Sequence, residues 1–307
     1  MPATSIRDLV IKDDDLVVGT HGRGFWILDD ITPLRQVAPA TLQEAAFLFA
    51  PPEAWRFRGN KNTDTPLPPD EPAGENPPDG AVVHYFLKAP ADGPVSLEIV
   101  DGGGAVVRRY RSDDPPEPPV EGRNIPDYWI RPPLPLSAAA GLHRFVWDLR
   151  YPPPAVLERT YPIAAVYRNT PAEPRGPWAL PGAYTVRLTV GARTLTRPLR
   201  LKIDPRVKAT PDDLRAQLER AQGIVRDLAR SADALRQAKE RARTADAAAA
   251  RAPAEQETKL SELNRRLAAV YEIVQEVDAA PTSAALRSAQ ELRQELDAAL
   301  ATSAAAK

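Results

Sequence analysis

Histidines are the side chains of this sequence best suited to proton transfer or metal binding at neutral pH. There are three, His21, His84 and His143, and they fall in separate predicted strands or turns. None shows the short spacing of a metal-binding pair such as H-x-x-x-H. The chain has no cysteine, which excludes disulfides, thiolate nucleophiles and cysteine-based zinc sites. The sequence therefore predicts neither a metal site nor a cofactor.

Hydrolytic chemistry by serine or carboxylate residues has equally little support. No G-x-S-x-G motif occurs, and no serine stands beside a histidine-bearing motif. Two acidic pairs, Asp29–Asp30 and Asp113–Asp114, supply the two carboxylates that a glycosidase needs. However, adjacent carboxylates on a strand point to opposite faces, and those in loops are usually solvated. We therefore expect no catalytic residue, and we do not expect this chain alone to be an enzyme.

Aromatic side chains in or beside predicted loops are better candidates for ligand contact. Two explanations stay open: the rings stack on sugars, as in carbohydrate-binding modules, or they dock long loops onto the folded core, which is the commoner arrangement. The candidate ligand-facing residues are Trp129 and Trp178 in these loops, with His21 and Arg23 at a turn between two predicted strands. The full aromatic set is Trp55, Tyr128, Trp129, Tyr151, Tyr161, Tyr167 and Trp178.

Charge and hydropathy exclude several kinds of partner. The 307 residues carry 40 basic and 41 acidic side chains, and this balance offers no general attraction for nucleic acid or anionic lipid. No run reaches the roughly 18 apolar residues of a membrane span. The opening MPATSIRDLV lacks the basic and apolar regions of a signal peptide. We expect no nucleic-acid partner, no membrane span and no export signal in this chain.

The first predicted strands form an incomplete sheet. Residues 6–28 give three short strands whose apolar runs, such as FWIL at 25–28, need sheet neighbours on both sides. Such a piece is expected to start inside a larger β structure. We predict a domain over 1–58 that holds these strands and a linker around 45–57. Residues 59–80, rich in turn formers and charges, are predicted to be a disordered loop.

A second group of strands fills residues 81–207. In LHRFVWDL (142–149), a period of two places the aromatic residues on one face, which predicts that Trp147 anchors a core. Proline-rich or irregular insertions over 113–137 and 151–181 separate the strands. Six strands with long loops are the pattern of an antiparallel β-sandwich of immunoglobulin-like (Ig-like) type. The predicted strands are 82–89, 94–101, 105–112, 142–149, 181–191 and 192–203.

The composition changes near residue 208, and residues 208–307 have a helical period. Thr210, Pro211 and Asp212 are suited to a helix start. Heptad-like seams of leucine, valine and alanine then follow, interrupted at Pro253 and Pro281, and they predict three helices in an antiparallel bundle. We expect the seams to pack against one another within one monomeric chain, with self-association through the seams as the alternative.

Two stretches resemble known families. LVVGTHGRGFWILDDITPL (16–34) resembles the closing repeat of BNR/sortilin-type β-propellers, found in large exported bacterial proteins often labelled glycosyl hydrolases. GLHRFVWDLR (141–150) and PGAYTVRLTVG (181–191) are similar to the WD…PGxYxxRL signature of FlgD-type Ig-like modules. The resemblance implies the last strands of a final propeller blade, followed by an Ig-like module. The earlier blades and the Asp-box motif S-x-D-x-G-x-T-W are absent from this sequence.

The fold class expected is therefore multidomain β plus α: a partial propeller blade, an Ig-like antiparallel β-sandwich and an antiparallel helical bundle. The resemblance implies a non-catalytic accessory or scaffolding region of a larger periplasmic or secreted propeller protein, whose missing N-terminal blades are its first partner. One alternative is the C-terminal part of a glycoside hydrolase or peptidase whose active site lies on the missing blades. Another is a carbohydrate-binding module. The expected ligand is a carbohydrate or a protein.

Overall fold

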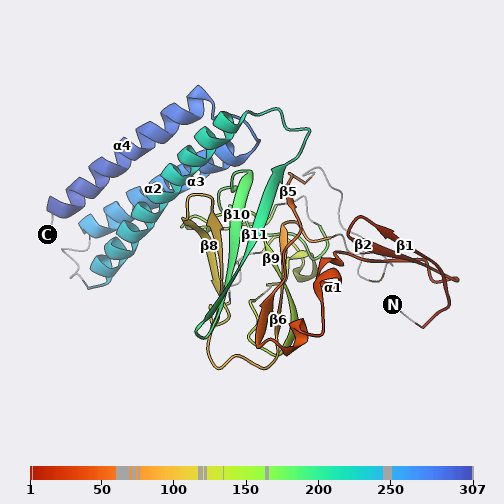
Figure 1. The fold of residues 1–307 in the computed structure, drawn as a ribbon. Coiled ribbons are helices and arrows are strands. Elements are labelled where there is room, and N and C mark those ends of the chain that lie inside the picture. Colours follow the sequence, from red (N-terminus) through yellow and green to blue (C-terminus); the bar gives the residue numbers. More distant parts are fainter. Residues whose placement is uncertain are drawn as a thin grey trace.

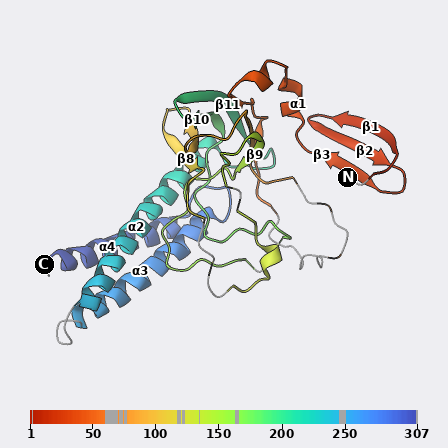
Figure 2. The same ribbon diagram turned by 90° about the horizontal axis from the view of Figure 1, so that it is seen from below.

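The computed structural model describes residues 1, 3–59, 70, 74, 77–116, 120, 123–133, 135–162, 166–244 and 251–305. Within them the chain contains both sheets and helices, so the expected mixed β plus α class is confirmed. An N-terminal sheet and a group of helices project from opposite sides of a central two-sheet body (Figures 1 and 2). Most of the loop predicted over 59–80 lies outside the described residues.

The N-terminal sheet has the three strands that the sequence predicts. They are β1 (Ile6–Lys12), β2 (Asp15–Thr20) and β3 (Phe25–Leu28), in the order β1-β2-β3. Both pairs are antiparallel. The turn between β2 and β3 contains Gly22 and Gly24, each with a φ of 71°, a conformation that glycine adopts without steric cost.

The central body consists of two sheets. The larger has the order β5-β11-β10-β7-β8 and the smaller the order β4-β6-β9. Every pair is antiparallel except β5, which runs parallel to β11. The strands are β4 (Ala46–Leu48), β5 (Ala54–Arg56), β6 (Ala81–Leu87), β7 (Val95–Asp101), β8 (Val106–Arg111), β9 (Gly141–Trp147), β10 (Gly182–Val190) and β11 (Arg193–Ile203).

All six strands predicted for this region are present, and two further strands join them. The stretch around 45–57, expected to be a linker, forms β4 and β5, and each adds an edge strand to a different sheet. Each has only three residues, too few to show alternating hydrophobicity, and Pro51 and Pro52 lie between them. The central body therefore begins at β4, well before residue 81.

Both sheets contribute side chains to one core. Trp147 on β9 is fully buried, and its ring lies 5.5 Å, centroid to centroid, from the ring of Tyr184 on β10. Phe145 is also buried while Leu142 is 54% exposed, so the predicted alternation along β9 is confirmed. The predicted role of Trp147 as a core anchor is confirmed as well.

Three long helices follow the sheets, as predicted: α2 (Pro211–Thr244), α3 (Arg251–Gln275) and α4 (Ser283–Ala305). The hydroxyl of Thr210 accepts a hydrogen bond from the backbone N–H of Asp213, whose carboxylate accepts from the Thr210 backbone N–H in return. This reciprocal pair satisfies donors that the first helical turn leaves open. Pro253 lies in the first turn of α3, and Pro281 lies between α3 and α4.

The helical seams pack on one another and on an insertion of the central body. Leucines of all three helices share one core with Val156 and Leu157, which lie in the insertion over 151–181. The side chain of Asn264 donates to the backbone oxygen of Ala155 at 3.2 Å and accepts from the N–H of Leu157 at 3.1 Å. The insertion therefore joins the helices to the sheets. Shorter helical turns are α1 (Thr32–Gln36), η1 (Thr41–Gln43) and η2 (Asp127–Trp129).

Candidate functional site

The N-terminal sheet carries apolar side chains on both of its faces. Residues that pair across neighbouring strands share a face, so the register assigns each side chain. Phe25 is 83% and Ile27 60% exposed, and every residue of β1 and β3 is exposed. Continuous apolar strands of this kind are typical of sheets covered on both sides. One face carries Val10, Val17, Phe25 and Ile27; the other carries Leu9, Ile11, Leu16, Val18, Trp26 and Leu28.

His21 and Arg23 lie at the end of this sheet that is remote from the central body. Both are exposed in the β2–β3 turn, where the N–H of His21 donates to the oxygen of Ser5 at 3.0 Å. The opposite end, the β1–β2 turn, contacts α1, because Arg35 donates to the oxygen of Asp13 at 2.6 Å. The two candidate residues thus stand at the outer rim of the sheet.

Asp30 fixes the inner end of the sheet to the central body. Its φ of 59° turns the chain sharply after β3. One carboxylate oxygen accepts hydrogen bonds from the N–H and the hydroxyl of Thr32, at 3.1 and 2.5 Å. The other lies 3.4 Å from Nδ1 of His84 on β6, and the Asp30 N–H donates to the carboxylate of Asp15 at 3.0 Å. These contacts form a joint between the two sheets, which we call the Asp30 joint.

The side chains at the Asp30 joint are partly removed from water. Burial lowers the pKa of His84, an effect that the charge of Asp30 opposes and that of Arg144 reinforces. Burial also raises the pKa of Asp29, and the neighbouring carboxylate of Asp15 adds to the rise. His84 is therefore neutral near pH 7, which suits a packed structural role.

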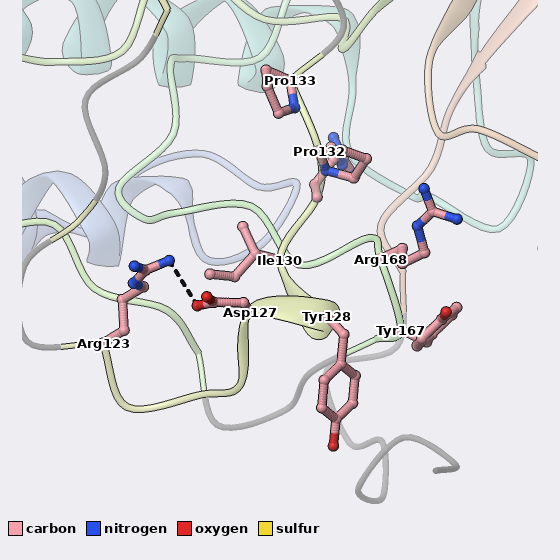
Figure 3. A pocket seen from close by; sticks show the side chains of 9 residues that line it. Arg123, Asp127, Tyr128, Ile130, Pro132, Pro133, Tyr167 and Arg168 are labelled. Carbon is pink, nitrogen blue, oxygen red and sulfur yellow. Dashed lines mark ion pairs between the residues drawn. The ribbon is translucent and has the colours of Figure 1, made fainter. Parts of the chain in front are cut away.

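A shallow pocket of about 360 Å³ lies where the two insertions meet (Figure 3). On one side Arg123 and Asp127 form an ion pair at 2.7 Å, and on the other lie Tyr167 and Arg168. The ring centroids of Tyr128 and Tyr167 are 6.4 Å apart. We call this the loop pocket. It is lined by Arg123, Asp127, Tyr128, Ile130, Arg131, Pro132, Pro133, Tyr167 and Arg168.

Backbone hydrogen bonds hold the walls of the loop pocket together. The N–H of Thr170 donates to the oxygen of Trp129 at 3.1 Å, and its own oxygen accepts from the N–H of Arg131 at 3.0 Å. The N–H of Arg168 donates to the oxygen of Tyr128 at 3.2 Å. Thr170 is 2% exposed, so these bonds are shielded from water. The two insertions are consequently joined to each other at this point.

Trp129 is adjacent in sequence to Tyr128 but is not among the residues that line the loop pocket. Its ring is half-buried and stands edge-on to Tyr128, with centroids 6.0 Å apart and an angle of 90° between the planes. Its indole nitrogen is buried without a hydrogen-bond partner in the described residues. Trp129 therefore supports Tyr128, which offers the exposed ring.

Trp178 lies at the junction between the central body and the helices. The guanidinium of Arg150 stacks over its ring at 3.7 Å from the centroid, with Arg56 and Arg58 at 5.3 and 5.5 Å. Its backbone N–H donates to the side chain of Gln275 in α3 at 3.3 Å. This placement matches the docking explanation for loop aromatics. The four candidate residues accordingly occupy three separate parts of the molecule.

A buried ion pair completes this junction. Arg56 at the end of β5 and Arg58 just after it both contact one carboxylate oxygen of Asp278, at 2.5 and 2.8 Å. The side chains of Arg56 and Asp278 are only 1% and 4% exposed. Burial lowers the pKa of Arg56. For Asp278 burial pushes the pKa up, but the hydrogen bond from Arg58 and the charge of Arg56 hold it below its usual range.

The residues considered for hydrolysis serve structural contacts. Asp113 binds Arg111 through two bonds of 2.7 and 2.8 Å, and Asp114 accepts from the Arg111 N–H. Asp30 belongs to the joint described above. Within the described residues, no group of three or more His, Asp or Glu side chains is arranged to hold a metal ion. None of the described helices combines the length and apolar character needed to cross a bilayer.

The sequence analysis predicted neither the ion pair of the loop pocket nor the ion pair at the junction between the central body and the helices. Tyr128 and Tyr167 are among the predicted loop aromatics, and the i,i+4 spacing of Arg123 and Asp127 is the local signal in the sequence for their ion pair. The contact of Arg56 with Asp278 had no such signal, because 222 positions separate the two. Ion pairs between residues this far apart in the chain produce no periodic pattern in the sequence.

The fold and its surfaces define a mixed β plus α protein with an uncovered N-terminal sheet and a polar loop pocket. Comparison of the chain with protein-family models, curated proteins and solved structures finds no match. The resemblance of residues 16–34 to a propeller repeat stays a prediction.

Proposed function

We propose that this chain is a non-catalytic accessory and scaffolding region of a larger exported β-propeller protein, in which β1–β3 supplies strands of the last blade. The observation that carries the proposal is the sheet with apolar side chains on both faces. Each blade of a propeller is packed between two neighbours, so both of its faces are buried. The likeness of residues 16–34 to a closing propeller repeat supports the same role.

The energetics of the sheet favour a covering partner. Apolar surface gains about 25 cal/mol for each Å² removed from water, and a fully buried Phe or Ile gains roughly 1.5–3 kcal/mol. The large side chains of β3 are 38–83% exposed, so most of this gain is unrealised. In the described residues, β1 and β3 each also have one edge without a strand partner. Open edges are sites for pairing with further strands.

The rest of the chain is suited to hold such a blade in place. The Asp30 joint fixes the sheet to the central body, and the Arg56–Asp278 pair fixes the body to the helices. In this proposal the two-sheet body is an Ig-like module and α2–α4 are its helical tail. Neither would contribute a catalytic group. Together they would hold the helical tail in a fixed position relative to the propeller.

The first test is the DNA that precedes the codon for Met1. The proposal expects an in-frame sequence that encodes repeated four-stranded blades. Those blades, expressed as a separate chain, should form a stable complex with this chain in size-exclusion chromatography with light scattering. Ile27→Asp should abolish the complex, because it places a charge on a face that becomes buried.

Val106→Asp is the matched control for this experiment. Val106, like Ile27, is an exposed β-branched aliphatic side chain, 49% accessible, but it lies on β8 of the central body. The complex should survive this substitution. Upstream DNA without blades, or a complex that tolerates Ile27→Asp, would contradict the proposal.

A further inference from the structure

The loop pocket lies on the central body, apart from the N-terminal sheet, and it combines exposed aromatic rings with an exposed ion pair. We propose that it binds a neutral saccharide chain built from pyranose rings with equatorial hydroxyls. The argument for this ligand class rests on the balance of charge, the two rings and the free hydrogen-bonding capacity of the ion pair. This binding goes beyond the scaffolding role and does not depend on it.

The charged side chains that line the loop pocket are balanced by partners. The guanidinium of Arg123 lies 2.7 Å from the carboxylate of Asp127. That of Arg131 lies 3.7 Å from the carboxylate of Asp79. Arg168 also has an interaction partner in the fold. An anionic ligand would have to compete with these partners, whereas a neutral ligand leaves the ion pairs in place. The balance of charge therefore favours a neutral ligand.

Two tyrosines give the pocket its aromatic faces. Tyr128 is 42% and Tyr167 38% exposed, so each ring still presents surface to a ligand. Their centroids are 6.4 Å apart and their planes are tilted by 45°, so the rings do not cover one another. A pyranose ring with equatorial hydroxyls presents C–H bonds on both of its faces. Such a face packs on an aromatic ring while the tyrosine hydroxyl stays hydrated.

The ion pair of Arg123 and Asp127 supplies the polar recognition. The two side chains are 38% and 80% exposed, so both groups are open to a ligand. A guanidinium has several N–H donors and a carboxylate accepts through both oxygens, so their mutual contact leaves each with free capacity. Neighbouring sugar hydroxyls donate as well as accept, and they are complementary to such a pair. Hydrogen bonds to charged groups are stronger than those between neutral groups.

The arrangement of these groups favours a chain of sugars over a single one. Asp127 and Tyr128 are consecutive residues of η2, and Figure 3 shows the ion pair at one end of η2 and the two tyrosine rings beyond the other. A sugar ring stacked on a tyrosine leaves the ion pair to the next ring of the chain. We therefore expect an oligosaccharide to bind more tightly than its monosaccharide.

The backbone of the pocket disfavours a peptide ligand. Ile130 and Thr170 form a β-bridge, and the hydrogen bonds around Thr170 already use backbone groups of both walls. Addition of a peptide strand needs such groups to be free. A polyproline segment can dock on aromatic rings, but it has no N–H group to donate to Asp127. The same backbone bonds hold the walls before a ligand arrives, which reduces the entropy lost on binding.

The test is isothermal titration of the full chain with cellohexaose, with glucose, decaproline and oligogalacturonate as comparisons. Cellohexaose should bind more tightly than the other three, and its affinity should change by less than about twofold as sodium chloride is added. Tyr128→Ala and Tyr167→Ala should each weaken binding about threefold to tenfold, in line with the value of an aromatic contact. Tyr167→Phe should retain most of the affinity, because it keeps the ring.

Asp127→Asn separates this proposal from an anion site. The change replaces a charged acceptor by a neutral one, so it should weaken the binding of cellohexaose by about threefold. In an anion site the same change would remove a repelling charge and strengthen binding. Tighter binding of oligogalacturonate than of cellohexaose, or a gain in cellohexaose affinity on Asp127→Asn, would overturn the proposal.

Trp55→Ala is the matched control for the tyrosine variants. Trp55 is a comparably exposed aromatic residue, at 46%, but it lies on β5 outside the pocket lining. Its removal should leave the affinity unchanged. Unfolding followed by circular dichroism checks that each variant keeps the fold. No binding of cellohexaose, equal binding of decaproline, or an equal loss on Trp55→Ala would each also overturn the proposal.

Discussion

The N-terminal sheet and the central body are made of the same kinds of residue, yet they differ in what covers them. Trp147 in β9 is fully buried, whereas Trp26 in β3 is 38% exposed. Ile99 in β7 is fully buried, whereas Ile27 in β3 is 60% exposed. Strand formation therefore follows from local pattern in both regions. Burial depends on whether a second layer is present.

The two regions also differ in hydrophobic period, and the period reports the number of layers. In β9 buried and exposed residues alternate, as expected for a sheet with one covered face. In β3 all four residues, FWIL, are apolar and all are exposed. Such runs belong to strands covered on both faces. Within the described residues, the exposed apolar run thus distinguishes the sheet that has no second layer from the sheets that share one.

The largest expected effect concerns the two tryptophans. Trp147→Ala should lower the free energy of unfolding by roughly 3–5 kcal/mol, because it deletes a large ring from a closed core. Trp26→Ala should cost less than about 1 kcal/mol, since its ring is already partly in water. Urea denaturation followed by circular dichroism measures both. Equal losses of unfolding free energy at the two positions would show that the N-terminal sheet is packed as tightly as the central body.

The next effect tests the junction between the body and the helices. Asp278→Ala should cost about 3 kcal/mol, because it leaves the buried guanidinium of Arg56 without its counter-charge. Asp297→Ala is the control: its pair with Arg230 is exposed and should contribute no more than about 1 kcal/mol. A small loss at Asp278 would mean that the junction opens to water.

The same pair predicts a dependence on pH. The folded pKa of Asp278 is below its usual value, so its contribution is present above about pH 4 and is lost as pH falls through the folded pKa. Thermal unfolding between pH 5 and pH 2 should therefore show a steeper loss for the unmodified chain than for Asp278→Asn. Equal losses of stability in the two proteins would show that the carboxylate of Asp278 contributes no pH-dependent stability.

Much of the fold was predictable from the sequence, because most elements are defined by local pattern. The strands over 6–28, the six longer strands of the body and the three helices each carry a clear period and suitable turn or capping residues. The strands β4 and β5 were not predicted: they have three residues each, and their pairing depends on partners far along the chain.

The candidate sites were predictable only in part. Sequence composition identified Tyr128 and Tyr167 as loop aromatics, but not that Thr170 would join the two insertions through its backbone. It also grouped Trp178 with ligand-facing residues, whereas Arg150 stacks on that ring inside a structural junction. Contacts between distant loops depend on the fold that surrounds them, which is why composition alone could not separate these cases.

A smaller effect concerns the Asp30 joint. Burial lowers the pKa of His84, so the folded state resists its protonation. Stability from this group is complete above about pH 6.5 and is lost as pH falls through the folded pKa. Unfolding curves from pH 7.5 to pH 5 should show a decline that is weaker in His84→Gln. Identical declines would show that His84 is accessible to water.

The smallest expected effect on the stability of the free chain is that of a substitution at Ile27 in the N-terminal sheet. Ile99→Thr introduces a hydroxyl into the closed core and should cost roughly 1–3 kcal/mol, whereas Ile27→Thr should stay within about 0.5 kcal/mol because its side chain already contacts water. If neighbouring blades cover β3, as we propose, this near-neutral position becomes a buried one. Ile27→Thr should then weaken the complex with those blades by at least about fivefold, a loss of roughly 1 kcal/mol. A substitution that is silent in the free chain and costly in the complex would identify β3 as a strand that lacks its layer. A cost of 1–3 kcal/mol in the free chain would instead show that the sheet is already covered.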